Sequence, residues 1–210
     1  MRLFISAFLF ITFVGFIACK DKKKGTEMVA VAEPKTAEVA QDAAKDSTAI
    51  RKLITDFYNL YNKNYSKFQE YHLYSSIKKK GMPPYKINWD QVEKYQNFIR
   101  TSIPQLGEEF IGNQKRFFRQ CDSAFKVDVE DELPYGFDYD WYTNSQEDAQ
   151  YSVDEINKPT AWLITRSGDY ATVEVKGWYD NNGKKALTAF ITLTMKKENG
   201  QWKIAKIGTD

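Results

Sequence analysis

Histidine and cysteine are nearly absent from this chain of 210 residues, which contains one His, His72, and two Cys. Catalytic or metal sites built from several histidines are therefore excluded. The formal net charge is only +2, so the chain lacks the strongly basic surface that is typical of a nucleic-acid-binding protein. Internal repeats are also absent. Residues 47–210 have the length of one domain with a substantial hydrophobic core.

The first nineteen residues have the pattern of a targeting segment. Arg2 supplies a positive end, residues 3–18 are almost wholly apolar, and Cys19 ends the run. This run is shorter than the roughly 20 residues that a permanent transmembrane helix needs. The ending Phe16-Ile17-Ala18-Cys19 resembles a bacterial lipobox, which implies that Cys19 is diacylated. We therefore predict a lipoprotein signal peptide over residues 1–19, with a secretory signal or an uncleaved anchor as the alternatives.

Residues 20–46 predict a disordered tether, because Lys, Ala, Glu, Val and Thr dominate them and no aromatic residue occurs. The acyl chains on Cys19 would hold the protein on membrane lipid. We expect it in the bacterial cell envelope, at the periplasmic face or at the outer membrane. With Cys19 lipidated, Cys121 has no partner for a disulfide and is expected to be a buried apolar residue.

The next part of the chain has helical periodicity. Apolar residues recur at helical spacing over about 48–61, after Asp46, Ser47 or Thr48 as a possible N-cap. A second helix is predicted over 89–103, with Asp90 as its cap, and a third over about 107–125. Between the first two, a run of lysines, a glycine and two prolines predicts a break.

The last fifty residues change to the alternation that is typical of strands. We predict strands over 160–165, 170–179, 187–195 and 202–207, with a hairpin turn at Asn182-Gly183. Such antiparallel strands have one apolar face, and the three helices are available to cover it. The predicted fold is therefore α+β, with the helices packed on a curved antiparallel sheet.

The segment that joins the two halves is acidic and aromatic. Between residues 128 and 155 the sequence has ten Asp or Glu and no Lys or Arg. We call residues 137–148 the crossover, and expect binding or structural roles for six of its side chains: Asp138, Tyr139, Asp140, Trp141, Gln146 and Asp148.

Several roles for the crossover remain open. Asp138 and Asp140 could accept hydrogen bonds from turn amides and fix the connection. The exposed acids and rings could instead recognise a basic partner, such as an envelope protein or a peptide. Together with Asn144, Glu147 and Asp148 the two aspartates could bind Ca²⁺, although the spacing does not match an EF-hand loop. Catalysis by paired carboxylates has least support, because the inward strand positions are apolar.

Several motifs resemble those of the bacterial domain-of-unknown-function family 3828. They are Leu53 to Tyr61 in the first helix, Gln114 to Phe118 in the third, Asp138-Tyr139-Asp140 with Gln146-Glu147-Asp148, and Glu198 to Ile204 at the end. The resemblance covers about residues 47–208. It implies small secreted or lipid-anchored proteins with the cone-shaped α+β fold of nuclear-transport-factor-2-like proteins, and it implies no activity.

From these observations we predict a lipid-anchored binding or structural module that is not an enzyme and has no metal or cofactor. The alternative is a small-molecule-binding, hydrolase-like or isomerase-like protein with a pocket inside the cone. That pocket would be lined by Tyr58, Tyr61, Phe117 and Trp178.

Overall fold

The computed structural model describes residues 36–210, apart from 128, 131–133, 159–160, 182 and 209–210. The predicted signal peptide, its Cys19 and residues 20–35 of the predicted tether lie outside these residues. Within the described part, no helix has both the length and the apolar character that crossing a bilayer demands.

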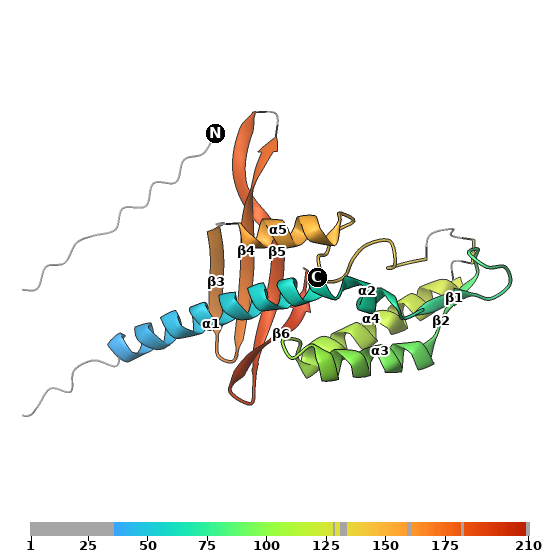
Figure 1. Ribbon diagram of the computed structural model, residues 1–210, viewed down its shortest axis with the longest axis horizontal. Coiled ribbons are helices and arrows are strands. Elements are labelled where there is room, and N and C mark those ends of the chain that lie inside the picture. Colours follow the sequence, from blue (N-terminus) through green and yellow to red (C-terminus); the bar gives the residue numbers. More distant parts are fainter. Residues whose placement is uncertain (1–35, 128, 131–133, 159–160, 182, 209–210) are drawn as a thin grey trace, which may run out of the picture. The chain divides into compact units, whose positions relative to one another are not determined.

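The α+β fold and the order of its two halves are confirmed: helices come first and pack against a four-stranded antiparallel sheet (Figure 1). The elements are α1 (Thr36–Lys63), α2 (Tyr65–Gln69), β1 (Tyr74–Ser76), β2 (Tyr85–Ile87), α3 (Trp89–Ser102), α4 (Glu108–Val127), α5 (Ala149–Asn157), β3 (Ala161–Ser167), β4 (Tyr170–Asn181), β5 (Lys184–Glu198) and β6 (Gln201–Ile207).

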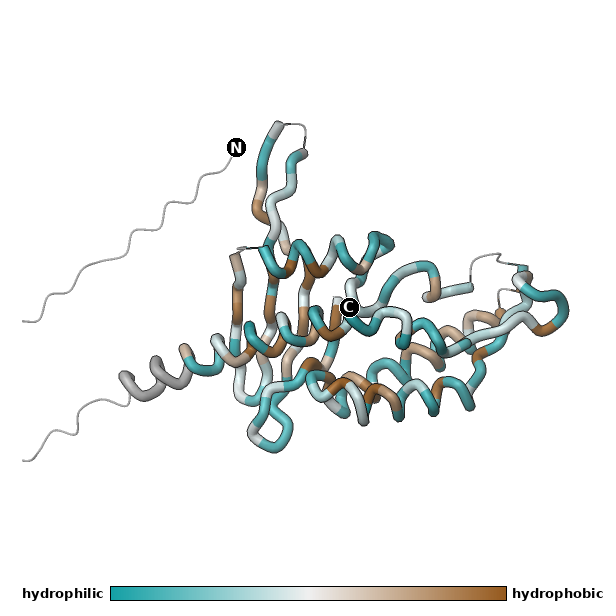
Figure 2. Tube along the Cα trace, viewed as in Figure 1, coloured by the Kyte–Doolittle hydropathy of each residue, from teal (hydrophilic) through white to brown (hydrophobic). Residues whose placement is uncertain are grey.

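The large sheet is a meander in the order β3-β4-β5-β6, as its short connections require. Alternate residues of the central strands, among them Val173, Leu193 and Met195, are fully buried on one face. Helices α1 and α5 lie across this face, and the hydrophobic residues gather where they meet the strands (Figure 2). Burial of this apolar face against the helices holds the two halves together.

The first helix begins at Thr36, not near Ser47, so the last eleven residues of the predicted tether are helical. Asp46 is therefore inside α1 and is not its cap. Its carboxylate lies 2.9 Å from Arg166 and 3.0 Å from Lys197, and it accepts a hydrogen bond from the Trp202 indole at 2.9 Å. These three partners belong to β3, β5 and β6, so Asp46 fixes the helix across the sheet.

Other differences from the sequence prediction lie near the crossover. Helix α3 begins at Trp89, so Asp90 lies in its first turn and Asn88 holds the cap position. The short helix α2, the β1–β2 hairpin and helix α5 were not predicted. The hairpin was missed because its strands have only three residues each, too few for an alternating pattern to be visible.

Candidate functional site

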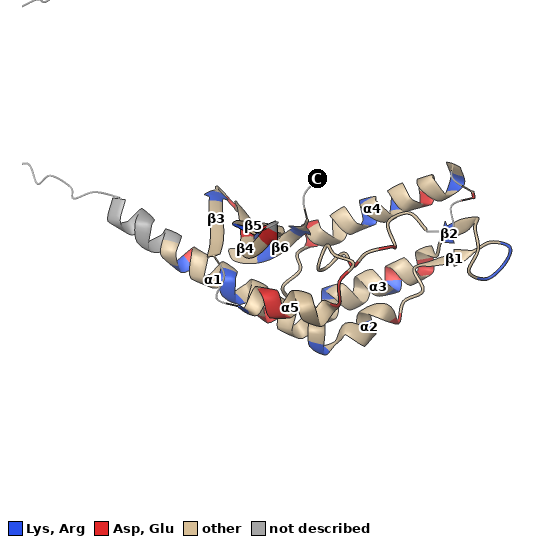
Figure 3. Cartoon of the chain, turned by 90° about the horizontal axis from the view of Figure 1, so that it is seen from above, with Lys and Arg blue, Asp and Glu red and all other residues tan. Residues whose placement is uncertain are grey.

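The crossover leads directly into α5 and packs against aromatic side chains of α1 and α4. In Figure 3 the acidic residues mark this connection, while the Lys and Arg residues mark the loop between β1 and β2. Trp141 packs against Phe137 and Phe118, with ring centroids 5.1 Å and 5.3 Å apart. Its indole N–H donates to the Gly136 carbonyl at 2.7 Å. The aromatic residues thus hold the crossover on the core.

Asp140 is the polar centre of the crossover. Its Oδ1 accepts hydrogen bonds from the backbone N–H groups of Tyr142, at 2.8 Å, and Thr143, at 3.4 Å. Its Oδ2 accepts one from the Tyr61 hydroxyl of α1. Backbone hydrogen bonds between Asp140 and Ser145 close the same loop. Both carboxylate oxygens of Asp140 are therefore engaged by internal donors.

Burial raises the pKa of Asp140, while the hydrogen bonds from Tyr61 and from the two amides oppose the rise. Burial, together with the nearby charge of Asp140, raises the pKa of the Tyr61 hydroxyl well above its usual value. Tyr61 therefore keeps its proton and acts as a permanent donor to the carboxylate. Together the hydroxyl and the carboxylate hold the loop through a hydrogen bond.

Tyr142 extends this network into the core through three partners, Tyr58, Tyr95 and Gln114. Tyr142 is buried, its carbonyl accepts from the Tyr58 hydroxyl at 2.7 Å, and its own hydroxyl is hydrogen-bonded to that of Tyr95. The Gln114 amide N–H groups approach the two hydroxyls at 3.4 Å and 3.5 Å. Side chains from α1, α3 and α4 thus meet at one crossover residue. The space between the helices and the crossover is filled by rings.

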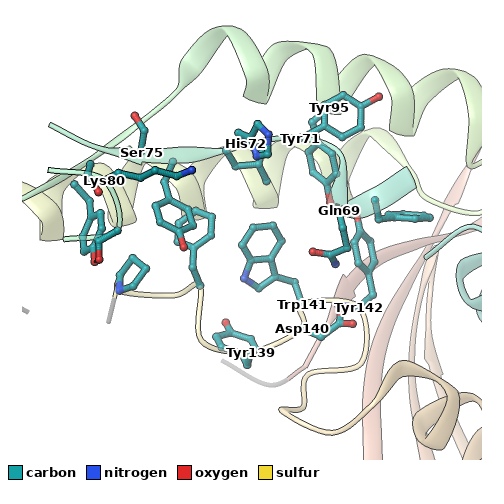
Figure 4. Close-up of a pocket in the computed structure, with 18 residues that line it drawn as sticks. Gln69, Tyr71, His72, Ser75, Lys80, Tyr95, Tyr139, Asp140, Trp141 and Tyr142 are labelled. Carbon is teal, nitrogen blue, oxygen red and sulfur yellow. Dashed lines mark hydrogen bonds between the residues drawn. The ribbon is translucent and has the colours of Figure 1, made fainter. Parts of the chain in front are cut away.

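A groove of about 1020 Å³ lies along the outer side of this network (Figure 4). The crossover forms one wall through Tyr139, Asp140 and Trp141. The chain from Phe68 to Tyr85, which includes β1 and the first residue of β2, forms the other. Most of its side chains are aromatic or polar, with Tyr71 and His72 near the middle and Lys80 towards one end. The groove is therefore both apolar and hydrogen-bonding.

The predicted site residues divide between two roles. Asp138 and Tyr139 are exposed, and Gln146 is exposed at the far end of the crossover. Asp148 caps α5, because its Oδ1 accepts a hydrogen bond from the Gln150 N–H at 2.7 Å. Asp140 and Asp148 thus hold the backbone, whereas Asp138 and Tyr139 present an acid and a ring to solvent.

The oxygen atoms proposed for Ca²⁺ do not converge. Asp140 turns inward to its three donors and Asp148 turns to its own helix. Over the residues that the structure describes, no group of three or more His, Cys, Asp or Glu side chains could hold a metal ion.

The pocket expected inside the cone is not assembled from its four predicted residues. Tyr58 and Tyr61 are fully buried in the core, and Trp178 is 73% exposed on β4. Phe117 instead lines a smaller cavity of about 510 Å³ between α4, the crossover and the end of β6. The reason is that Tyr142 and its aromatic neighbours occupy the space that an internal pocket would need.

Sequence reasoning missed the second wall of the groove. Residues 78–84 were interpreted as a break because of their lysines, glycine and prolines, and His72 was interpreted as a surface or packing residue. The signal in the sequence was the three tyrosines around the break, Tyr71, Tyr74 and Tyr85, because a merely solvated connection is usually polar. In the structure Leu73 and Tyr85 are buried.

No protein-family model, no curated protein and no solved structure matches this chain.

Proposed function

We propose that this protein is an exported, lipid-anchored module of the bacterial envelope, whose folded domain binds a basic and aromatic segment of another polypeptide in the groove beside the crossover. The observation that carries the proposal is the groove itself. Its volume of about 1020 Å³ is at the upper end for small-molecule pockets, which are about 300–1,000 Å³, and suits a peptide segment.

The chemistry of the walls supports a peptide of this composition. Exposed tyrosine rings such as Tyr139 offer a large contact area at a low cost in side-chain entropy. Asp138 adds a solvent-facing carboxylate next to that ring, which would attract a basic partner. Asp140 strengthens the negative potential without being a contact itself, because both of its oxygens are already hydrogen-bonded.

The same arrangement supports a module that is not an enzyme. Asp140 and the buried Tyr61, Tyr95 and Tyr142 lie in one hydrogen-bond network, and burial is the first cause of their raised pKa values. His72 lines the groove, and its backbone carbonyl accepts a hydrogen bond from the Asn88 side chain. Membership of the domain-of-unknown-function family 3828 and the lipid anchor at Cys19 remain predictions.

Capture from envelope extract tests the groove. Immobilised wild-type protein should retain a partner that an Asp138→Asn/Tyr139→Ala variant retains at least tenfold less. Tyr151→Ala is the matched control, because Tyr151 is an exposed ring of α5 outside the groove. Equal retention by all three proteins would rule out the groove as the binding site.

The anchor has its own test. Metabolic labelling with a palmitate analogue should mark the wild-type chain and not a Cys19→Ser variant. Continued labelling and membrane fractionation of the variant would show that Cys19 is not the anchor.

A further inference from the structure

One edge of the large sheet is formed by strand β3. The strand order is β3-β4-β5-β6, so β3 pairs with β4 on one side, and no strand of the described chain pairs with it on the other. Helix α1 crosses the face of the sheet at this end, and no described element lies beside β3 in the plane of the sheet (Figure 1). Backbone N–H and C=O groups along such an edge are available to a further strand.

The turn between β3 and β4 defines which residues of β3 direct their backbone groups outward. Only Gly168 and Asp169 separate Ser167 from Tyr170, and these two face each other across the strands. The residues that flank a two-residue turn form a hydrogen-bonded pair, so Ser167 and every second residue before it pair with β4. The alternate residues direct their N–H and C=O groups away from the sheet: Trp162, Ile164 and Arg166.

Strand β3 lacks the features that usually keep an edge strand from pairing. It has seven residues and pairs with β4 without a register shift, so no bulge bends the edge away. It contains no Pro, Lys, Asp or Glu. Its one charged residue, Arg166, is held by Asp46 of α1 at 2.9 Å. Leu163 is 47% exposed, so the strand also presents an apolar side chain to solvent.

The sequence of β3 is complementary to itself in one antiparallel register. When two copies of the strand lie with Ile164 opposite Ile164, each Trp162 is opposite the other strand's Arg166. Leu163 is then opposite Thr165. All outward N–H and C=O groups of both strands find partners in this register, whereas any other antiparallel register leaves at least one residue unpaired. The only cation of the strand is opposite an aromatic ring and not opposite a second cation, which is favourable.

We propose that two copies of this chain join β3 to β3 in this register and form one continuous sheet across a two-fold axis. The contact uses the same surface on both chains, so it closes as a dimer and covers the open edge of each sheet. A strand from another protein would satisfy the backbone groups equally, but the complementary side-chain pairs favour a second copy. The dimer is independent of what the groove binds, because no residue of β3 lines the groove.

Disulfide trapping between two differently tagged full-length copies in intact cells tests the contact and its register. One copy carries Leu163→Cys and the other Thr165→Cys, both at exposed positions. In the proposed dimer these two residues are directly opposite in a non-hydrogen-bonded pair, with Cα atoms about 4.5 Å apart, which suits a disulfide. The mixed disulfide should form at least tenfold more than when both copies carry Leu163→Cys, because those two positions are offset by two residues along the strands. The native Cys121 is buried and does not compete.

Proline at the centre of the edge provides a second measurement. The N–H of Ile164 points away from β4, so Ile164→Pro removes a hydrogen bond of the dimer and leaves the pairing with β4 intact. Placed in both copies, Ile164→Pro should lower the mixed disulfide at least tenfold. Ile164→Val is the matched control and should leave the yield unchanged. Circular dichroism of the purified variants shows whether each is folded.

Mixed disulfide at the level of the Leu163→Cys pair would overturn the inference, as would an unchanged yield from folded Ile164→Pro. Cross-linking of Leu163→Cys to a different protein, in place of the second copy, would also overturn it. None of these outcomes concerns the groove, so the proposed function stands or fails by its own capture experiment.

Discussion

The hydroxyl of Tyr61 donates a hydrogen bond to the carboxylate of Asp140, which lies 79 residues further along the chain. This contact connects the last turn of α1 to the crossover. It explains why a carboxylate can be partly buried here: Tyr61 supplies one oxygen with a donor and the turn amides supply the other. The Tyr61 hydrogen bond therefore fixes the crossover, which forms one wall of the groove.

Removal of the Tyr61 hydroxyl is expected to destabilise the fold. Tyr61→Phe leaves a carboxylate oxygen of Asp140 without its donor, and we expect the free energy of unfolding to fall by about 1–3 kcal/mol. Chemical denaturation followed by circular dichroism measures this loss. The control is Tyr65→Phe, because Tyr65 is an exposed ring beside Tyr61 and should change the stability by less than about 0.5 kcal/mol. Equal stability of both variants would refute the role of the contact.

Asp46 should be more important for stability than Asp56, an exposed acid of the same helix. Asp46→Asn removes the charge that Arg166 and Lys197 share, and we expect a loss of about 1.5–3 kcal/mol. Asp56→Asn breaks only an exposed pair with Lys52 and should cost about 0.3–0.5 kcal/mol. Denaturant titration of the three proteins compares these losses, and similar values for the two variants would contradict the assigned role.

The stability that Asp46 contributes should decrease as the pH is lowered. Burial works against ionisation of Asp46, but the hydrogen bonds from Trp202 and Lys197 outweigh it and lower the pKa of the carboxyl in the folded protein. Its contribution is therefore complete above the unfolded pKa of about 3.9 and is lost as the pH falls through the lower folded value. The stability difference between wild type and Asp46→Asn should be constant from pH 7 to about pH 5 and should shrink below pH 4. If the stability difference between the two proteins grew as the pH fell, the assigned role of the Asp46 carboxylate would be contradicted.

Gly136 should not tolerate a side chain. Its φ is +77°, and a Cβ there would lie 2.5 Å from Cζ of Phe117 and 3.0 Å from Sγ of Cys121. Gly168 has φ +58° and open space around it, so Gly168→Ala measures the backbone cost alone, about 1–2 kcal/mol. We expect Gly136→Ala to cost about 1–3 kcal/mol more, because the crossover must move away from α4. Thermal or denaturant unfolding compares the two variants, and equal losses would show that the crossover is loosely packed.

Cys121 should be chemically silent in the folded protein. It is fully buried, and burial raises the pKa of its thiol to about 12, so almost no thiolate is present at pH 8. In a chain with Cys19→Ser, we expect a thiol-specific disulfide reagent to modify Cys121 within minutes in denaturant and at least a hundredfold more slowly in buffer. Rapid modification of the native protein would mean that α4 and the crossover separate often.

The sequence predicts the fold well where the pattern is long. The stripe from Ile50 to Tyr61 and the alternation in β4 and β5 reveal one helix and two strands, because many residues report the same face. The role of Asp46 could not be predicted, since its carboxylate is held by the distant residues Arg166 and Lys197. These contacts have no local signature.

The candidate site was predicted in part. The acids and rings of the crossover are evident from composition, but their division into inward Asp140 and outward Asp138 depends on Tyr61, which is remote in sequence. The second wall of the groove is formed by residues 68–85, a segment that contains a run of lysines and two prolines. Pairing of β1 with β2 brings that segment beside the crossover, and three-residue strands leave no recognisable pattern.

The central claim is that the groove beside the crossover is occupied by a partner in the envelope. A photo-activatable benzoylphenylalanine in place of Tyr139, introduced into full-length protein in living cells, tests it most directly. The same residue in place of Tyr151 is the control, because both positions are exposed aromatic sites. The account predicts a discrete cross-linked species from position 139 and none from position 151. Absence of any cross-linked product at 139, or equal products at both positions, would contradict it.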